Sequence, residues 1–134
     1  MLLSLLPKED KIYFIELVKQ LVLVDGEETD AEKKIVKKLR LELGEEIEKA
    51  KKLNLSCDQL IEYFINKSET TKRIVFMNLI SASLQDEWYN VEQHMLLSDV
   101  QLKFGINDKQ KNDFMKIIYA ERDLREKAKR IVNQ

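Results

Sequence analysis

The stretch IYFIELVKQLVLV, from Ile12 to Val24, is apolar on nearly every side when it is wound into a helix. A helix with no polar face belongs in the middle of a bundle, because every side of it needs apolar neighbours. Pro7 suits the first turn of this helix, and the apolar run stops at Asp25 and Gly26. The stretch therefore predicts a central, buried helix that ends in an acidic turn.

An amphipathic helix is expected directly after that turn. The sequence TDAE, from Thr29 to Glu32, is a capping box, in which Thr29 accepts a hydrogen bond from the amide of Glu32 and the Glu32 side chain reaches back. Gly44 supplies a left-handed stop at the C-terminal end. The apolar residues between these signals share one face of the helix: Ile35, Val36, Leu39 and Leu43.

The rest of the chain predicts more helices and no strand. A short charged helix is expected from Glu45 to about Leu53, and the start signals of the later helices are Ser56, Ser68, Asn90 and Asn107. The residues expected to be buried in the last two helices are Val91, Met95, Leu96, Val100 and Phe104, then Phe114, Ile117, Ile118, Leu124, Ala128 and Ile131. The fold class is therefore all-α, with about seven helices.

Two parts of the chain, residues 12–44 and 73–105, match at a constant offset of 61 positions. Their turns, caps and stops are in register: Asp25 with Asp86, Thr29 with Asn90, and Gly44 with Gly105. Such repetition predicts two pseudo-symmetric helical hairpins packed as a compact bundle, in a single domain of residues 1–134. We expect the apolar helices at its centre and both acidic turns at one pole. The alternative explanation of the match is chance, because any two helical hairpins share some sequence features.

Composition narrows the class of protein. The chain has 134 residues, of which 35% are charged, yet its formal net charge is only −1, so it lacks the overall positive field of a nucleic-acid binder. Cys57 is the only cysteine, so no internal disulfide is expected. The opening MLLSLLP is too short for a signal peptide, and no apolar run reaches the roughly 20 residues that cross a bilayer. These features favour a cytoplasmic protein.

The acidic turns suggest a metal site. Carboxylates are the ligands that calcium and magnesium prefer, and five are candidates: Asp25, Asp30, Glu32, Asp86 and Glu92. An EF-hand is excluded because Gly26 comes second in the loop rather than sixth. The alternative is that these charges only stabilise the positive N-terminal ends of helices.

Three further features are candidates for function. Trp88 and Tyr89 stand together in the second turn, where large rings either bind a protein partner or cover the ends of the core. Cys57 would lie in the first turn of a helix, which can favour a thiolate, but catalysis would require it to meet His94.

The last turns are rich in basic residues: Arg122, Arg125, Lys127, Lys129 and Arg130. We expect these residues to form a solvated face of the helix, whose cations suit its C-terminal end. The alternative is contact with an anionic membrane, to which the apolar residues 1–6 could contribute.

The residues Leu21–Glu27, the capped Glu32 and the Leu43–Gly44 stop together resemble the TerB-like domain, named for tellurite-resistance proteins. The resemblance implies an all-helical fold, divalent-metal binding at the acidic turns, and a role in stress-response or co-chaperone assemblies. The second turn departs from the pattern, because Glu87 stands where the glycine should be.

The expected function is therefore a non-enzymatic binding or adaptor module with a protein partner. A divalent-metal-binding protein is the first alternative, and a thiol enzyme that uses Cys57 is the second. No nucleotide, zinc or hydrolase motif occurs in the sequence.

Overall fold

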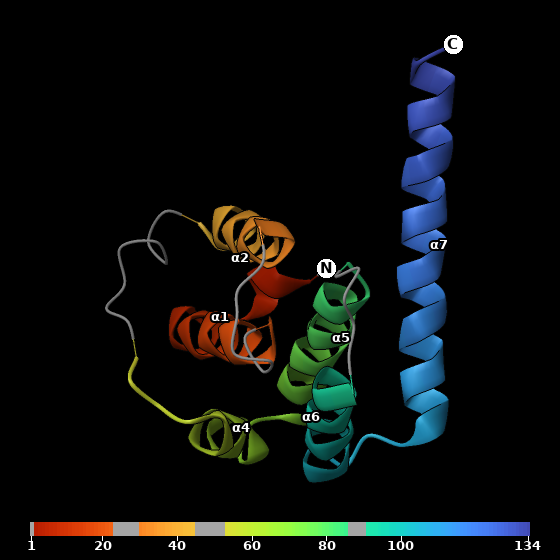
Figure 1. The fold of residues 1–134 in the computed structure, drawn as a ribbon. Coiled ribbons are helices and arrows are strands. Elements are labelled where there is room, and N and C mark those ends of the chain that lie inside the picture. Colours follow the sequence, from red (N-terminus) through yellow and green to blue (C-terminus); the bar gives the residue numbers. More distant parts are fainter. Residues whose placement is uncertain (1, 23–29, 45–52, 86–90) are drawn as a thin grey trace.

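The computed structural model describes residues 2–22, 30–44, 53–85 and 91–134, apart from the side chains at positions 30–32, 35 and 85. The described part is all-helical (Figure 1). Its elements are a short 3-10 helix η1 (Leu3–Leu5) and the α-helices α1 (Lys8–Val22), α2 (Asp30–Leu43), α4 (Cys57–Ile65), α5 (Glu69–Gln85), α6 (Val91–Lys103) and α7 (Asp108–Val132). The all-α prediction is confirmed for these residues. The short helix expected from residue 45 falls on 45–52, outside the description.

Helices α1 and α5 form the centre of the bundle. They contact each other; α2, α4 and α6 also pack on α1, while α4, α6 and α7 pack on α5 (Figure 1). Phe14 and Leu17 of α1, like Val75 and Phe76 of α5, have no exposed surface. The two apolar runs therefore lie at the centre, as their lack of a polar face predicts.

The predicted start and stop signals hold where the structure describes them. Ser56 accepts a hydrogen bond from the amide of Gln59 at 3.2 Å, and the Gln59 side chain accepts one from the Ser56 amide at 2.9 Å. Asn107 begins α7 with the same reciprocal pair. Gly44 and Gly105 have φ angles of +106° and +69°, the left-handed region that favours glycine.

The predicted repeat agrees with the order of the helices. Residues 12–44 and 73–105 each contain a central helix followed by a second helix, and Val91 begins α6 61 positions after Asp30 begins α2. The acidic turns themselves lie outside the described residues. Their position at one pole, and the superposition of the two hairpins, stay predictions.

Helix α6 buries only part of the face expected: Val100 and Phe104 are buried and Leu96 is half-buried. Gln93, Leu97 and Val100 are buried, whereas Val91 and Met95 are 69% and 64% exposed. The prediction was wrong for these two residues. Apolar side chains occur on several sides of α6, so periodicity alone does not tell which side meets α5.

Helix α7 is only partly covered by the bundle. Its first half packs on α5 through the buried Ile118 and the half-buried Phe114 and Met115. All residues from 120 to 134 are exposed, and the helix continues past the other elements (Figure 1). The buried stripe expected along α7 is therefore wrong at Ile117, which is 53% exposed, and at every position beyond Ile118. Its 25 residues span about 38 Å and the 17 of α5 only about 26 Å, so α5 cannot cover the whole helix.

The apolar opening of the chain belongs to the core. Leu3 and Leu6 are only 4% and 3% exposed, and η1 packs against α2 and α5. Leu2 and Leu5 are 57% and 66% exposed, so packing in this segment is shown for Leu3 and Leu6. Among the described residues, no helix combines the length and the apolar character that crossing a membrane requires.

Candidate functional site

The described residues do not assemble the acidic metal site. Asp25 and Asp86 lie outside the description, and Asp30 and Glu32 are placed only as backbone in the first turn of α2. Glu92 is exposed in the first turn of α6. Within the described ranges, no group of three or more His, Cys, Asp or Glu side chains could hold a metal ion. The calcium or magnesium prediction therefore stays a prediction.

The expected partner-binding residues Trp88 and Tyr89 also fall outside the described residues. Their role as interface anchors stays a prediction for the same reason. The structure therefore directs attention to surfaces and cavities that the sequence did not single out.

Cys57 has the opposite electrostatic environment from a reactive thiol. The side chain is half-buried in the first turn of α4, and burial, followed by the negative charges of Asp58 and Asp99, raises the pKa of its thiol to about 11. A nucleophilic cysteine needs a lowered pKa, because the thiolate is the reactive form. The positive charge of Lys103 lowers the pKa but is the smallest of these effects. His94 lies about 13 Å from Lys103 along the axis of α6. This environment argues against the thiol-enzyme alternative.

A buried polar cluster joins α1 to α4. The Tyr63 hydroxyl donates a hydrogen bond of 2.6 Å to Asp10, whose carboxylate also lies 3.6 Å from the Lys67 ammonium. The Tyr63 ring stacks on Tyr13 with centroids 3.6 Å apart. Burial and then the hydrogen bond to Asp10 raise the pKa of Tyr63. We name Asp10, Tyr13, Tyr63 and Lys67 the Asp10 cluster; because the Asp10 carboxylate is used by both Tyr63 and Lys67, the cluster acts as a structural clamp.

A cavity of about 280 Å³ opens between α5, α6 and α7. Its lining residues are Ile80, Ser83, Leu84, His94, Leu97, Lys111, Met115 and Tyr119. Ligand pockets in proteins span about 300–1,000 Å³ and combine an apolar lining with a few polar groups. By size and lining, this cavity is the candidate binding site, and we call it the α5–α7 cavity.

Ser83 is the unusual member of this lining. The residue is only 1% exposed, and its Oγ has no hydrogen-bond partner among the described residues. Buried hydroxyls are nearly always hydrogen-bonded, because the loss of water is otherwise uncompensated. A ligand in the α5–α7 cavity is one way to supply the missing partner.

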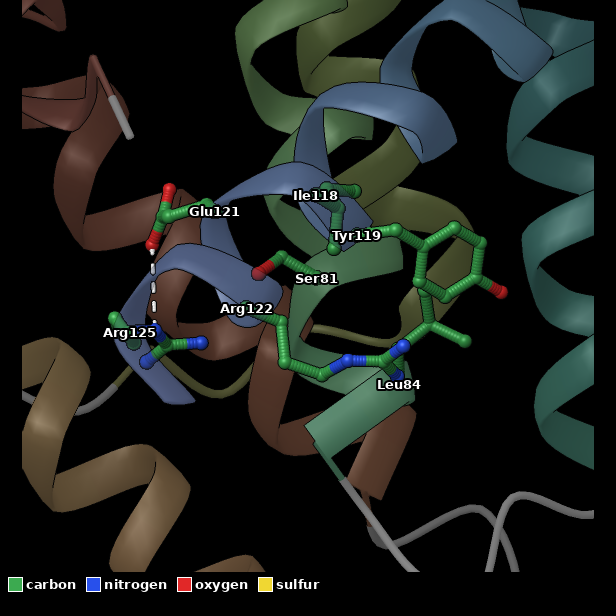
Figure 2. Close-up of a pocket in the computed structure, with 7 residues that line it drawn as sticks. All are labelled: Ser81, Leu84, Ile118, Tyr119, Glu121, Arg122 and Arg125. Carbon is green, nitrogen blue, oxygen red and sulfur yellow. Dashed lines mark ion pairs between the residues drawn. The ribbon is translucent and has the colours of Figure 1, made fainter. Parts of the chain in front are cut away.

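A second, smaller pocket lies beside the cavity (Figure 2). It holds about 30 Å³, and Leu84 and Tyr119 line both spaces. Figure 2 shows Arg125 paired with Glu121, whose nitrogen and oxygen are 4.0 Å apart. The guanidinium carbon of Arg122 lies 4.9 Å from the centre of the Tyr119 ring. The pocket is large enough for about one or two water molecules only, so we do not assign it a ligand.

Sequence reasoning missed the α5–α7 cavity because three helices converge to form it. A clue lies in the two serines, Ser81 and Ser83, that interrupt the apolar run of residues 74–84. Periodicity classes that run as buried but does not show what faces each serine. His94, which the sequence offered as a partner for Cys57, is exposed on α6 at the edge of the cavity.

Replacement of Ser83 by Ala is expected to raise the free energy of unfolding by about 1–2 kcal/mol, because it removes an unpartnered buried hydroxyl and improves helix propensity. Urea denaturation of the ligand-free protein measures the change. Ser81→Ala is the matched control: the propensity gain is the same, but Ser81 has an interaction partner and is less buried. A loss of stability in Ser83→Ala larger than in Ser81→Ala would show that the hydroxyl is already satisfied.

Comparison with known proteins adds no assignment. No protein-family model matches the chain, and no curated protein or solved structure matches it.

Proposed function

We propose that this chain is a non-enzymatic binding or adaptor module, and that the exposed face of α7 is its recognition surface. Ile117, Leu124 and Ile131 are 53%, 67% and 59% exposed. Their seven-residue spacing places successive members about 20° apart on a helix, and all three within about 40°. We call these three residues the α7 stripe. A row of exposed apolar residues at this spacing is what a second helix packs against.

The charges beside the α7 stripe support an acidic partner. Lys127 and Arg130 lie on the same side of the stripe, about 60° and 120° from Leu124 at 100° per residue. Neither has an ion pair among the described residues. A partner helix with glutamates or aspartates along that edge would pair with both cations. The occupant we propose is therefore an amphipathic helix of a protein partner with an acidic flank.

A second copy of this chain fits the surface less well. The carboxylates that α7 would offer to Lys127 and Arg130 are already near cations of their own helix. Their nitrogen–oxygen separations are 4.0 Å for Glu121 with Arg125, 3.7 Å for Asp123 with Arg122, and 3.4 Å for Glu126 with Lys129. Self-association therefore brings no new charge complementarity.

Substitution of Leu124 by Asp is expected to weaken binding of an acidic amphipathic peptide by about 30-fold or more, as at the centre of other apolar interfaces. The probe is a labelled designed helix with leucines every seven residues and a glutamate flank, and its fluorescence anisotropy gives the affinity. Leu102→Asp is the matched control, because Leu102 is 79% exposed but lies on α6. The same peptide with a lysine flank tests the charge.

Three results would overturn this proposal. The first is equal binding of the acidic and basic peptides, or none. The second is a Leu124-dependent dimer in sedimentation experiments at micromolar concentration, which would assign the stripe to a second copy. The third is Leu124-dependent binding to phosphatidylserine vesicles without peptide binding, which would assign it to a membrane.

The TerB-like resemblance supports the same class of function, with a stress-response or co-chaperone assembly in the cytoplasm as the proposed setting. The divalent-metal alternative rests on the carboxylates of residues 25–32 and 86–92. Calorimetric titration with calcium and magnesium separates the two, since an adaptor that acts through α7 needs neither ion.

A further inference from the structure

We infer that the α5–α7 cavity binds a small carboxylic acid with an apolar body, such as an arylacetic acid. This inference does not depend on the α7 stripe. Met115 and Tyr119 line the cavity, whereas Leu124 lies on the opposite side of the same helix, about 140–180° away at 100° per residue. The two surfaces are therefore separate sites on α7.

The lining determines the body of the ligand. Ile80, Leu84, Leu97 and Met115 are apolar, and Tyr119 adds an aromatic ring. The volume of about 280 Å³ is near the lower end of the usual range for ligand pockets. A nucleotide or another large polyanion would need more space and several cations. The body that fits is a single ring or a short branched chain.

The polar groups of the lining determine the charge of the ligand. Lys111 provides a cation and His94 provides ring nitrogens, and none of the lining residues that the structure describes carries a carboxylate. A cationic ligand would face Lys111 with no counter-charge, whereas a carboxylate would form a charge-assisted hydrogen bond with it.

The hydroxyl of Ser83 gives independent support. It lines the cavity and is buried, and its Oγ has no partner within the described part of the chain. An acceptor on the ligand would satisfy this donor, and a carboxylate has an oxygen to spare after pairing with one lysine. Without a ligand, this buried hydroxyl in the last turn of α5 would lower stability with no compensating role.

The test uses the full chain and four matched probes: phenylacetate, the neutral phenylacetamide, the cationic phenethylamine, and acetate, which lacks the apolar body. Amide chemical shifts in two-dimensional NMR spectra locate and quantify binding. We expect phenylacetate to bind about tenfold more tightly than phenylacetamide, because a hydrogen bond to a charged group is stronger than one to a neutral group. The amides that shift should belong to residues 80–84, 94–97 and 111–119.

Lys111→Gln should reduce phenylacetate affinity about tenfold and abolish the preference over phenylacetamide. Lys109→Gln is the matched control, because Lys109 is exposed on α7 and does not line the cavity. Ser83→Ala should weaken phenylacetate without unfolding the chain. Lys111 is half-buried, whereas Ser83 is buried, so the Lys111 variant tests the inference even if Ser83→Ala perturbs the helix.

Several results would overturn the inference. One is the absence of phenylacetate binding at millimolar concentration. Another is equal affinity for the acid, the amide and the amine, which would show a nonspecific apolar site. A third is binding of acetate as tight as that of phenylacetate, or shifts confined to other helices. The last is an unchanged affinity in Lys111→Gln.

Discussion

Phe64→Ala is expected to lower the free energy of unfolding by about 3–5 kcal/mol, the largest effect of any change considered for this chain. Phe64 has no exposed surface, and it packs edge-on against Tyr63 and Phe104, with ring centroids 5.0 and 6.3 Å away. Truncation removes the ring contact between α4 and Phe104, which directly follows α6, and leaves a cavity that the helices cannot fully close. Urea denaturation followed by circular dichroism measures the loss.

Leu124→Ala is the control for this experiment. It removes a similar apolar side chain, but Leu124 is 67% exposed, so the free energy of unfolding should change by no more than about 0.5 kcal/mol. If Leu124→Ala destabilised the protein as much as Phe64→Ala, the α7 stripe would be part of the core rather than a free surface. The comparison therefore also tests the premise of the proposed function.

Asp10→Ala is expected to lower the free energy of unfolding by about 2–3 kcal/mol, because it leaves the Tyr63 hydroxyl without its acceptor and removes the counter-charge of Lys67. Asp10 is only 4% exposed, and its bond to Tyr63 connects residues 53 positions apart. A double-mutant cycle with Tyr63→Phe should give a coupling energy of about 1 kcal/mol or more.

The neighbouring Glu9 provides the control for the Asp10 cluster. It is exposed and occupies the same first turn of α1, so Glu9→Ala removes only a favourable charge at the helix start, about 0.3–1 kcal/mol. If both variants lost the same free energy of unfolding, and Asp10 showed no coupling to Tyr63, Asp10 would stabilise the protein only through its charge at the start of α1. Thermal or urea unfolding distinguishes these outcomes.

The position of α7 connects the two proposed sites. One side of its first half closes the α5–α7 cavity, and the far side of the helix, from Ile117 to Ile131, carries the α7 stripe. Peptide binding and phenylacetate binding can therefore be measured separately. Leu124→Asp should leave phenylacetate affinity unchanged, and Lys111→Gln should leave peptide affinity unchanged.

Local signals determined much of the fold. The capping boxes at Ser56 and Asn107 and the glycine stops at Gly44 and Gly105 involve residues within one turn of each other. Their hydrogen bonds and backbone angles do not depend on distant neighbours, so they can be predicted from the residue order. The central position of α1 and α5 was predictable for a related reason: with apolar residues on all sides, burial is the favourable option in any packing.

The sequence by itself determined that the chain is helical, where several helices begin and end, and which two lie at the centre. Only the tertiary structure decided which faces of α6 and α7 are covered. Apolar residues on a partly polar helix can be buried in the core or can remain exposed as a binding surface, and the sequence does not distinguish the two. It also decided that Ser83, Lys111 and Met115 line one cavity and that Asp10 meets Tyr63. These contacts join residues far apart in the chain, and their distances depend on how the helices pack rather than on any local spacing.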